Sequence, residues 1–191
     1  YTALNNLQLD NGYVDVQESV AIVVETVSGE GLLNNNGTTT FEDNPDDQAL
    51  SLRLANNGTM NLANGMKTTL TELAGTGTIN NDGSLTLNGD QLGSDSAVLN
   101  TAGDVKIEGG TTTFKSVVFN DKSTFDTDDN QSYTPSIEIG TGESSAWLNI
   151  TETLEGAPTS PDQSVGTITI GNNGVIAYGT YNIEKVEQVV N

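Results

Sequence analysis

The sequence predicts an all-β chain folded as a right-handed parallel β-helix, that is, a β-solenoid with coils of about 20–25 residues. Three observations predict this fold. Apolar and polar residues alternate in short runs, which is the pattern of strands with one buried and one solvated face. Turn signals separate nearly all of these runs. A five-residue motif recurs along the chain, beginning with Gly and usually apolar at its third and fifth positions.

The motif repeats at a distance longer than one strand and its turn. Its clear copies lie at 37–41, 58–62, 83–87 and 103–107, so that successive glycines are 21, 25 and 20 residues apart. Further copies lie at 123–127, 146–150, 166–170 and 174–178, and second strands are expected at 50–54, 69–73, 97–99 and 116–119. A jelly-roll-like β-sandwich is the alternative that explains the strand spacing. The longer repeat favours the solenoid, because each coil buries its inner face only by stacking on its neighbours.

Asparagine and glycine mark the turns between the strands. The tripeptides at 35–37, 56–58, 81–83 and 172–174 each end in Asn-Gly or Asp-Gly. These dipeptides are typical of tight turns, in which we expect them to supply a positive φ.

The two ends of the chain lack this pattern, and we divide the sequence accordingly. Residues 1–30 are expected to be an N-terminal cap or pairing strands, residues 31–180 the solenoid coils, and residues 181–191 a C-terminal strand, cap or inter-subunit segment. An uncapped solenoid exposes unpaired backbone at its ends. If a terminal strand pairs with another subunit, the candidate self-association residues are Val20, Ile22, Val24, Ile183, Val186 and Val189.

Composition excludes several classes of function. The net charge of −20 argues against nucleic-acid binding, since a phosphate backbone would be repelled. The chain has neither Cys nor His, which removes thiol chemistry and the commonest general base. No apolar stretch reaches the roughly 20 residues of a membrane span. The chain does not begin with Met, and we interpret it as a processed or excised piece.

Two acidic clusters are the candidate metal sites. They consist of Asp43, Asp46 and Asp47, and of Asp126, Asp128 and Asp129. Neither has the spacing of an EF-hand, and solvated loops are the simpler interpretation. We therefore expect no cofactor, with surface-bound Ca²⁺ as the alternative. Catalysis would need two carboxylates about 5–10 Å apart on neighbouring coils.

Other residues are candidate contact or modification sites. Asn36, Asn57, Asn130 and Asn149 begin Asn-x-Ser/Thr sequons, which are candidate glycosylation sites in a glycosylating secretory system. Trp147, the single tryptophan, is expected in the core or at a coil edge, with stacking on a sugar or receptor as the alternative.

Coils such as residues 75–87 (GTGTINNDGSLTL) resemble the passenger domains of bacterial autotransporters and haemagglutinin-like adhesins. The resemblance covers roughly residues 31–180. It concerns the order of glycine, asparagine and apolar residues within each coil. It implies secretion, exposure at the cell surface, and a role in adhesion, aggregation or biofilm formation. A passenger fragment would lack the membrane barrel of such a protein.

We therefore expect an extracellular structural or adhesive module, a stiff β-rod that mediates attachment or aggregation and is not an enzyme. Its expected partners are copies of itself or a ligand on a host or cell surface. One alternative is a subunit of an extracellular filament joined by terminal strand pairing. The other is a polysaccharide-processing β-helix enzyme.

Overall fold

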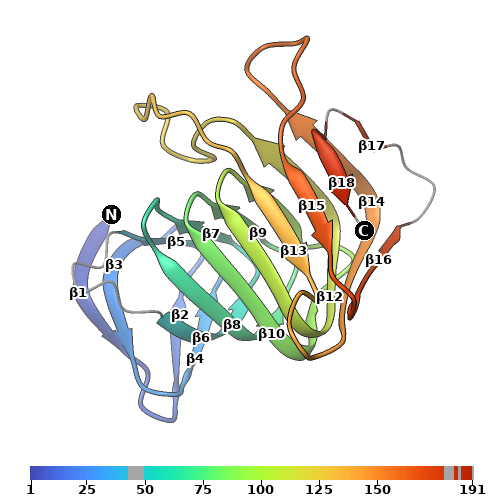
Figure 1. The fold of residues 1–191 in the computed structure, drawn as a ribbon. Helices are drawn as coiled ribbons and strands as arrows, with labels where there is room; N and C mark the ends of the chain where they lie inside the picture. The colour runs from blue at the N-terminus through green and yellow to red at the C-terminus, as the bar shows by residue number, and fades with distance from the viewer. Residues whose placement is uncertain (43–49, 179–182, 185, 191) are drawn as a thin grey trace.

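The computed structural model describes residues 1–42, 50–178, 183–184 and 186–190, and it shows an all-β chain without helices. All strand pairs are parallel, and the strands stack turn upon turn as a β-solenoid (Figure 1). The predicted fold class is therefore confirmed. The described residues form eighteen strands, and the longer ones bend around a corner and contribute to more than one side of the solenoid.

Three faces enclose the interior. The first face is a continuous stack of β1 (Thr2–Gln8), β3 (Ala21–Ser28), β5 (Thr38–Phe41), β7 (Thr59–Leu62), β9 (Thr78–Asn81), β11 (Val98–Thr101), β12 (Asp104–Asn120), β14 (Ala146–Ala157) and β17 (Ile183–Glu184). The second face, in front in Figure 1, stacks β6 (Leu50–Asn56), β8 (Lys67–Ala74), β10 (Ser84–Gly93), β12, β13 (Ser136–Ile139), β15 (Thr167–Ile170) and β18 (Gln188–Val190).

The third face has two parts. β2 (Tyr13–Val16) and β4 (Leu32–Asn35) stack with β6 and β8, while the later halves of β10, β12 and β14 stack with β16 (Gly174–Tyr178). Residues 1–30, expected as a cap or pairing strands, form β1 to β3, which stack on the solenoid in the same parallel register.

The turns are slightly shorter than the motif spacing suggested. On the first face the register advances by 17, 21, 19, 20 and 18 residues, from Ala21 to Thr38, Thr59, Thr78, Val98 and Ser116. The 25-residue spacing arises because Gly37 and Gly58 precede strands of the first face, whereas Gly83 and Gly103 precede strands of the second. The next advance, from Ser116 to Thr153, is 37 residues.

The core follows from alternation within most of the strands. In β9, β11 and β13 partly exposed and buried residues alternate, as expected where one side of a strand faces the interior. The three largest fully buried side chains are Phe41, Phe114 and Phe119, and smaller aliphatic residues occupy most other inward positions. One continuous core therefore runs through the stacked turns.

Buried asparagines replace apolar residues at the corners. The Asn35 Nδ2 donates to Asn56 Oδ1 at 2.8 Å and to the Thr59 carbonyl at 2.9 Å. One turn further, Asn56 Nδ2 donates to the Thr78 carbonyl at 3.0 Å. These bonds satisfy backbone acceptors at the first residues of β7 and β9, so the asparagines link consecutive turns.

The glycines of the Asn-Gly turns have a different role from the one the sequence suggested. We expected positive φ at Gly37, Gly58, Gly83 and Gly174, but the positive-φ glycines of the described chain are others, such as Gly75 and Gly110. At Gly58 a Cβ would overlap the Gly37 carbonyl oxygen of the turn below. Glycine is therefore required at these corners for close approach of stacked backbones, and the positive-φ interpretation is wrong.

Candidate functional site

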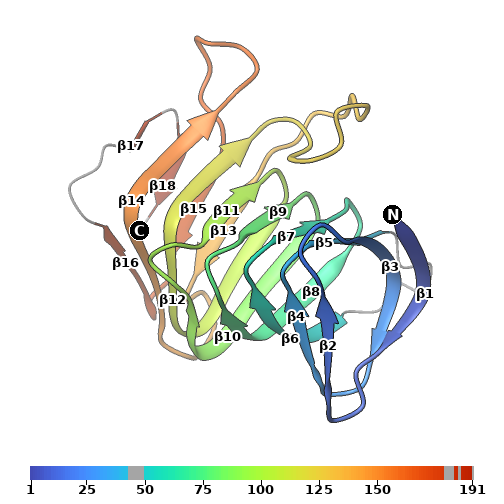
Figure 2. The same cartoon turned by 180° about the vertical axis from the view of Figure 1, so that it is seen from behind.

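Two loops leave the solenoid at the same edge. Residues 121–135 connect β12 to β13, and residues 158–166 connect β14 to β15. Both project from the upper edge in Figures 1 and 2. The 121–135 loop lies within the long register advance from Ser116 to Thr153 on the first face, and the 158–166 loop follows that advance. Loops held by a rigid scaffold are where binding residues concentrate in proteins.

Asp82 anchors the 121–135 loop to the body of the solenoid. Its side chain is 4% exposed. Its Oδ1 accepts hydrogen bonds from the Thr124 backbone N–H at 2.8 Å and from the Thr124 hydroxyl at 2.7 Å, and its Oδ2 accepts one from the Ser123 hydroxyl. A buried carboxylate is tolerated only when such donors satisfy it, so this contact fixes the base of the loop.

A second carboxylate ties the two loops together. The Thr159 backbone N–H lies 3.0 Å from each carboxylate oxygen of Asp121, and the Thr159 hydroxyl donates to Oδ2 at 2.9 Å. Charge-assisted bonds of this kind are stronger than neutral ones. The two loops are therefore positioned relative to each other as well as relative to the strands.

Within the 121–135 loop, Tyr133 packs inward against the body. Its hydroxyl donates to Asp129 Oδ2 at 2.6 Å, and the Gln131 backbone N–H donates to Asp129 Oδ1 at 2.8 Å. These two bonds lower the pKa of the Asp129 carboxyl below its ordinary value. Burial, followed by the bond to Asp129, raises the pKa of the Tyr133 phenol above its ordinary value.

The raised pKa of Tyr133 predicts that stability falls at alkaline pH. Because the pKa of Tyr133 is raised on folding, its contribution to stability is present below about pH 10 and is lost as pH rises further. We expect the Tm of the native chain to fall more steeply between about pH 9.5 and about pH 11.5 than that of Tyr133→Phe, whose ring cannot ionise. Thermal unfolding followed by circular dichroism measures both slopes, and equal slopes would contradict the prediction.

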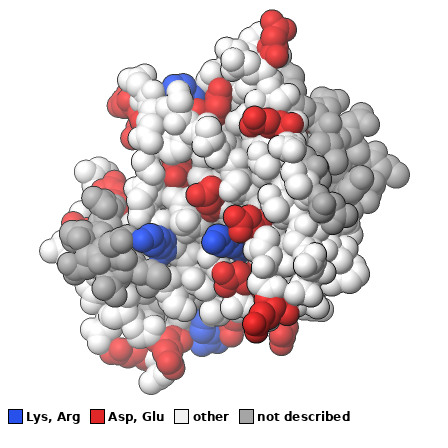
Figure 3. Space-filling view, in the orientation of Figure 1, with Lys and Arg blue, Asp and Glu red and all other residues white. Residues whose placement is uncertain are grey.

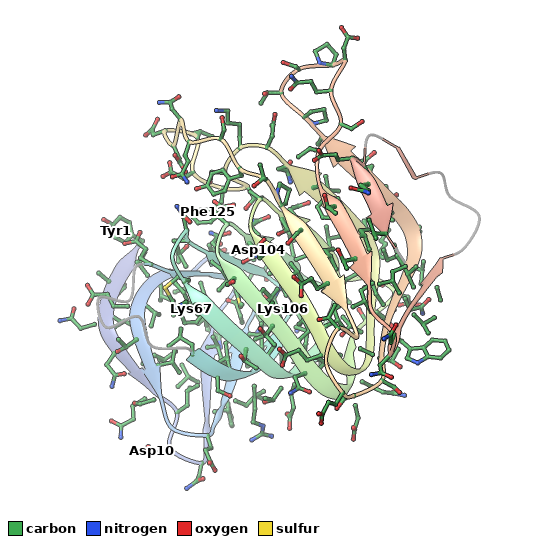
Figure 4. The ribbon with its side chains drawn as sticks, in the orientation of Figure 1. Tyr1, Asp10, Lys67, Asp104, Lys106 and Phe125 are labelled. Carbon is green, nitrogen blue, oxygen red and sulfur yellow. The ribbon has the colours of Figure 1, made fainter. Side chains whose placement is uncertain are left out.

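Hollows lie on both sides of the anchored loop. One, of about 340 Å³, is lined by residues that include Asn64, Lys67, Asp104 and Gln131. The other, of about 300 Å³, is lined by residues that include Asp126 and Asp129. Figure 4 shows Lys67 and Asp104 on the second face with Phe125 above them, and Figure 3 shows Asp and Glu side chains scattered over this face.

The predicted acidic clusters are only partly described. Asp43, Asp46 and Asp47 lie outside the described residues. The Asp126 Oδ1 accepts from the Asp128 backbone N–H at 3.0 Å, so it turns towards its own loop, as Asp129 does. In the described part of the chain, no group of three or more acidic side chains is arranged to hold a metal ion.

The four candidate glycosylation sites lie at the surface to different extents. Asn57 and Asn130 are exposed, and Asn36 and Asn149 are partly exposed. The Asn57 Nδ2 donates to Asn36 Oδ1 at 3.2 Å, which stacks these two side chains on adjacent turns. All four remain candidates on grounds of position.

The candidate self-association residues do not gather on one edge. Ile22 and Val24 are core side chains of β3, which pairs with β1 on one side and β5 on the other. Val20 is exposed and Val186 packs against the core. The side chains of Ile183 and Val189 lie outside the described residues.

Trp147 lies on the surface, not in the core. It is 46% exposed, whereas its neighbours Ala146 and Leu148 are fully buried. The expected core position is therefore wrong, whereas Trp147 does lie near a corner, as the second residue of β14. The alternation of β14 explains the difference, because Leu148 and Ile150 take the inward positions and Trp147 must point outward.

Asp82, Asp121 and Tyr133 were not singled out in the sequence. Asp82 was assigned only to the Asn-Asp-Gly turn at 81–83, and Tyr133 lies in a segment without strand periodicity. The contacts of Asp82 join residues 41 and 42 positions apart. A single sequence carries no signal for such a pairing.

The chain thus belongs to the structural class of parallel β-solenoids. No known protein family matches the sequence, and neither a curated protein nor a solved structure matches it. Within residues 1–42, 50–178, 183–184 and 186–190 there is no helix with the length and hydrophobicity needed to cross a bilayer.

Proposed function

We propose that the chain is a structural and adhesive module of an extracellular surface protein, in which a stiff β-rod holds attachment surfaces at fixed positions. The observation that carries this proposal is the continuous parallel ladder, in which each strand of the first face pairs with the next from β1 to β17. A ladder of this kind resists bending and leaves three flat faces and the corner loops open to a partner.

The anchored loops support the adhesive part of the proposal. Loops that contact a partner lose affinity if they must first be ordered. Here Asp82 and Asp121 already hold residues 121–135 and 158–166 against the solenoid and against each other. With a net charge of −20, the partner is expected to be uncharged or positively charged at the contact.

Attachment is tested directly with beads that carry the purified chain. We expect these beads to be retained under flow on at least one surface in a panel of immobilised glycans, matrix proteins and cultured cells. Beads carrying the heat-unfolded chain are the control for charge and coverage. If folded and unfolded chains give the same retention on every surface, the adhesive proposal is wrong.

Self-assembly is the second candidate function. Among the residues that the structure describes, β1 pairs only with β3 and β2 only with β4, and Tyr1 and Tyr13 of the same end are 94% and 70% exposed. An unpaired parallel strand is a template for another chain. Electron micrographs of the preparation used for the beads distinguish the two functions, since filaments of joined rods would assign the chain to self-assembly.

A further inference from the structure

We propose that Trp147 and its neighbours on the third face form a stacking surface for a neutral glycan. The proposal rests on the adhesive function above and names the chemistry of its ligand. The Trp147 surface consists of outward-facing residues on four stacked strands, namely Gln91, Thr111, Thr113, Trp147, Asn149, Val175 and Ala177.

The register places these side chains next to one another. Thr111 pairs with Trp147, and Trp147 pairs with Val175 on the following turn. Partners on adjacent parallel strands are about 4.8 Å apart, so hydroxyl and methyl groups lie immediately on both sides of the indole. Thr113 and Asn149 pair with each other two positions along the same strands, which adds hydrogen-bonding groups at the edge of the ring.

The alternation of β14 explains why residue 147 points outward, but an outward position does not by itself require a tryptophan. Tryptophan is usually largely buried, and at 46% exposure Trp147 leaves much of its apolar surface in water. A single aromatic ring on a flat strand face is too small for a protein interface, which needs a broader apolar centre. The flat face of a pyranose ring, with hydroxyls around its rim, matches one indole surrounded by threonine and asparagine.

Charge favours a neutral ligand. None of the seven residues of the Trp147 surface is charged, although the chain carries a net charge of −20. Acidic polysaccharides and phosphate groups would be repelled by the molecule as a whole. A neutral saccharide experiences no such repulsion and exchanges hydrogen bonds with water for hydrogen bonds with the side chains.

A polar hollow lies at the start of the same strand. Its volume is about 360 Å³, and it is lined by residues that include Asn88, Lys106, Glu143 and Ser144. The Gly110 backbone N–H donates to the Ser145 carbonyl at 3.0 Å, which holds this turn against the preceding one. Ser144 lies three positions before Trp147, at most about 10 Å along the chain. We expect the adjoining sugar units of a glycan chain stacked on Trp147 to extend towards this hollow.

The single tryptophan allows a specific test. With excitation at the red edge, which selects tryptophan over the five tyrosines, the fluorescence comes from Trp147 alone, because the sequence contains no other tryptophan. We expect a saturable shift of its emission on titration with at least one of cellohexaose, maltohexaose, mannohexaose and N-acetylchitohexaose. Hexagalacturonate, an acidic sugar, should give none. No shift with any neutral hexasaccharide would overturn the proposal.

Variants assign the binding to this surface. With the sugar that binds, Trp147→Ala should lose about tenfold or more in affinity by NMR titration, equivalent to about 1.4 kcal/mol, while Trp147→Phe keeps part of it. Tyr13→Ala is the matched control, because Tyr13 is the other large exposed aromatic among the described residues of this face. An equal loss in Tyr13→Ala, or none in Trp147→Ala, would contradict the assignment.

Comparing bead adhesion with the binding of soluble sugar distinguishes the glycan surface from the adhesive function. If beads of the native chain adhere and Trp147→Ala beads adhere equally well, adhesion holds and the glycan surface is wrong. If soluble sugar binds but no bead adheres, the glycan surface holds and adhesion is wrong. An emission shift that depends only on protein concentration, without sugar, would show that a second copy covers Trp147 and would overturn the proposal.

Discussion

Replacing Gly103 with alanine is expected to destabilise the fold by about 3 kcal/mol. A Cβ at this position would overlap the carbonyl oxygen of Gly83 in the turn below and approach the Asp82 carbonyl carbon to 2.7 Å. Both contacts are with backbone, which cannot rotate away as a side chain can. The turns must therefore separate locally, which lengthens the 2.9 Å hydrogen bond from the Asp104 N–H to the Gly83 carbonyl. Urea unfolding measures the free energy of unfolding of both chains.

Gly142→Ala is the matched control for this substitution. Gly142 also lies in a turn, and nothing would lie within 4 Å of its added Cβ. Its φ is outside the left-handed region, so that alanine should be tolerated or slightly stabilising. Equal stabilities of Gly103→Ala and Gly142→Ala would show that close approach between turns does not govern the glycine motif.

Replacing Asp82 with alanine is expected to release the 121–135 loop and to destabilise the fold by about 2–3 kcal/mol. The substitution removes the carboxylate that accepts three hydrogen bonds. The backbone N–H and hydroxyl of Thr124 and the hydroxyl of Ser123 then lose their acceptor. The solenoid itself should persist, because its ladder and core do not depend on this side chain. The loop should become sensitive to limited proteolysis before the body does.

Asp128→Ala controls for charge in this experiment. Asp128 belongs to the same loop but is exposed. Its removal changes the net charge by the same amount as removal of Asp82, and exposed substitutions usually change stability by less than about 0.5 kcal/mol. Proteolytic cleavage of the loop at the same rate in both variants would mean that Asp82 is not its anchor.

The fold was predictable because it depends on local periodicity. Alternation within the motif specified the inward residues at the start of β10 and β12 and those of β5, and the recurring glycine motif distinguished a solenoid from a sandwich. The assignment of strands to faces was not predictable. The same glycine motif precedes β7 on the first face and β10 on the second. Both corners need glycine because the backbones of stacked turns approach each other closely there.

The candidate site was less predictable because its contacts are distant in sequence. Asp82 meets Ser123 and Thr124 only after the 121–135 loop folds back onto the body. Trp147 was a different kind of error. The alternation of residues 146–150 already contained the information that it points outward, but the general preference of tryptophan for the interior was given more weight.

The 37-residue advance around the 121–135 loop has a consequence for how the chain folds. Up to Ser116 each new strand joins a neighbour only 17 to 21 residues away, so a formed turn is a nearby template for the next. Between Ser116 and Thr153 the distance doubles, which adds about 0.6 kcal/mol to the entropy of closure, a rate factor of about three. Folding that proceeds from the N-terminal side should pause at this step. The first half of the rod would then exist briefly as an ordered intermediate with the open edge of β12 exposed.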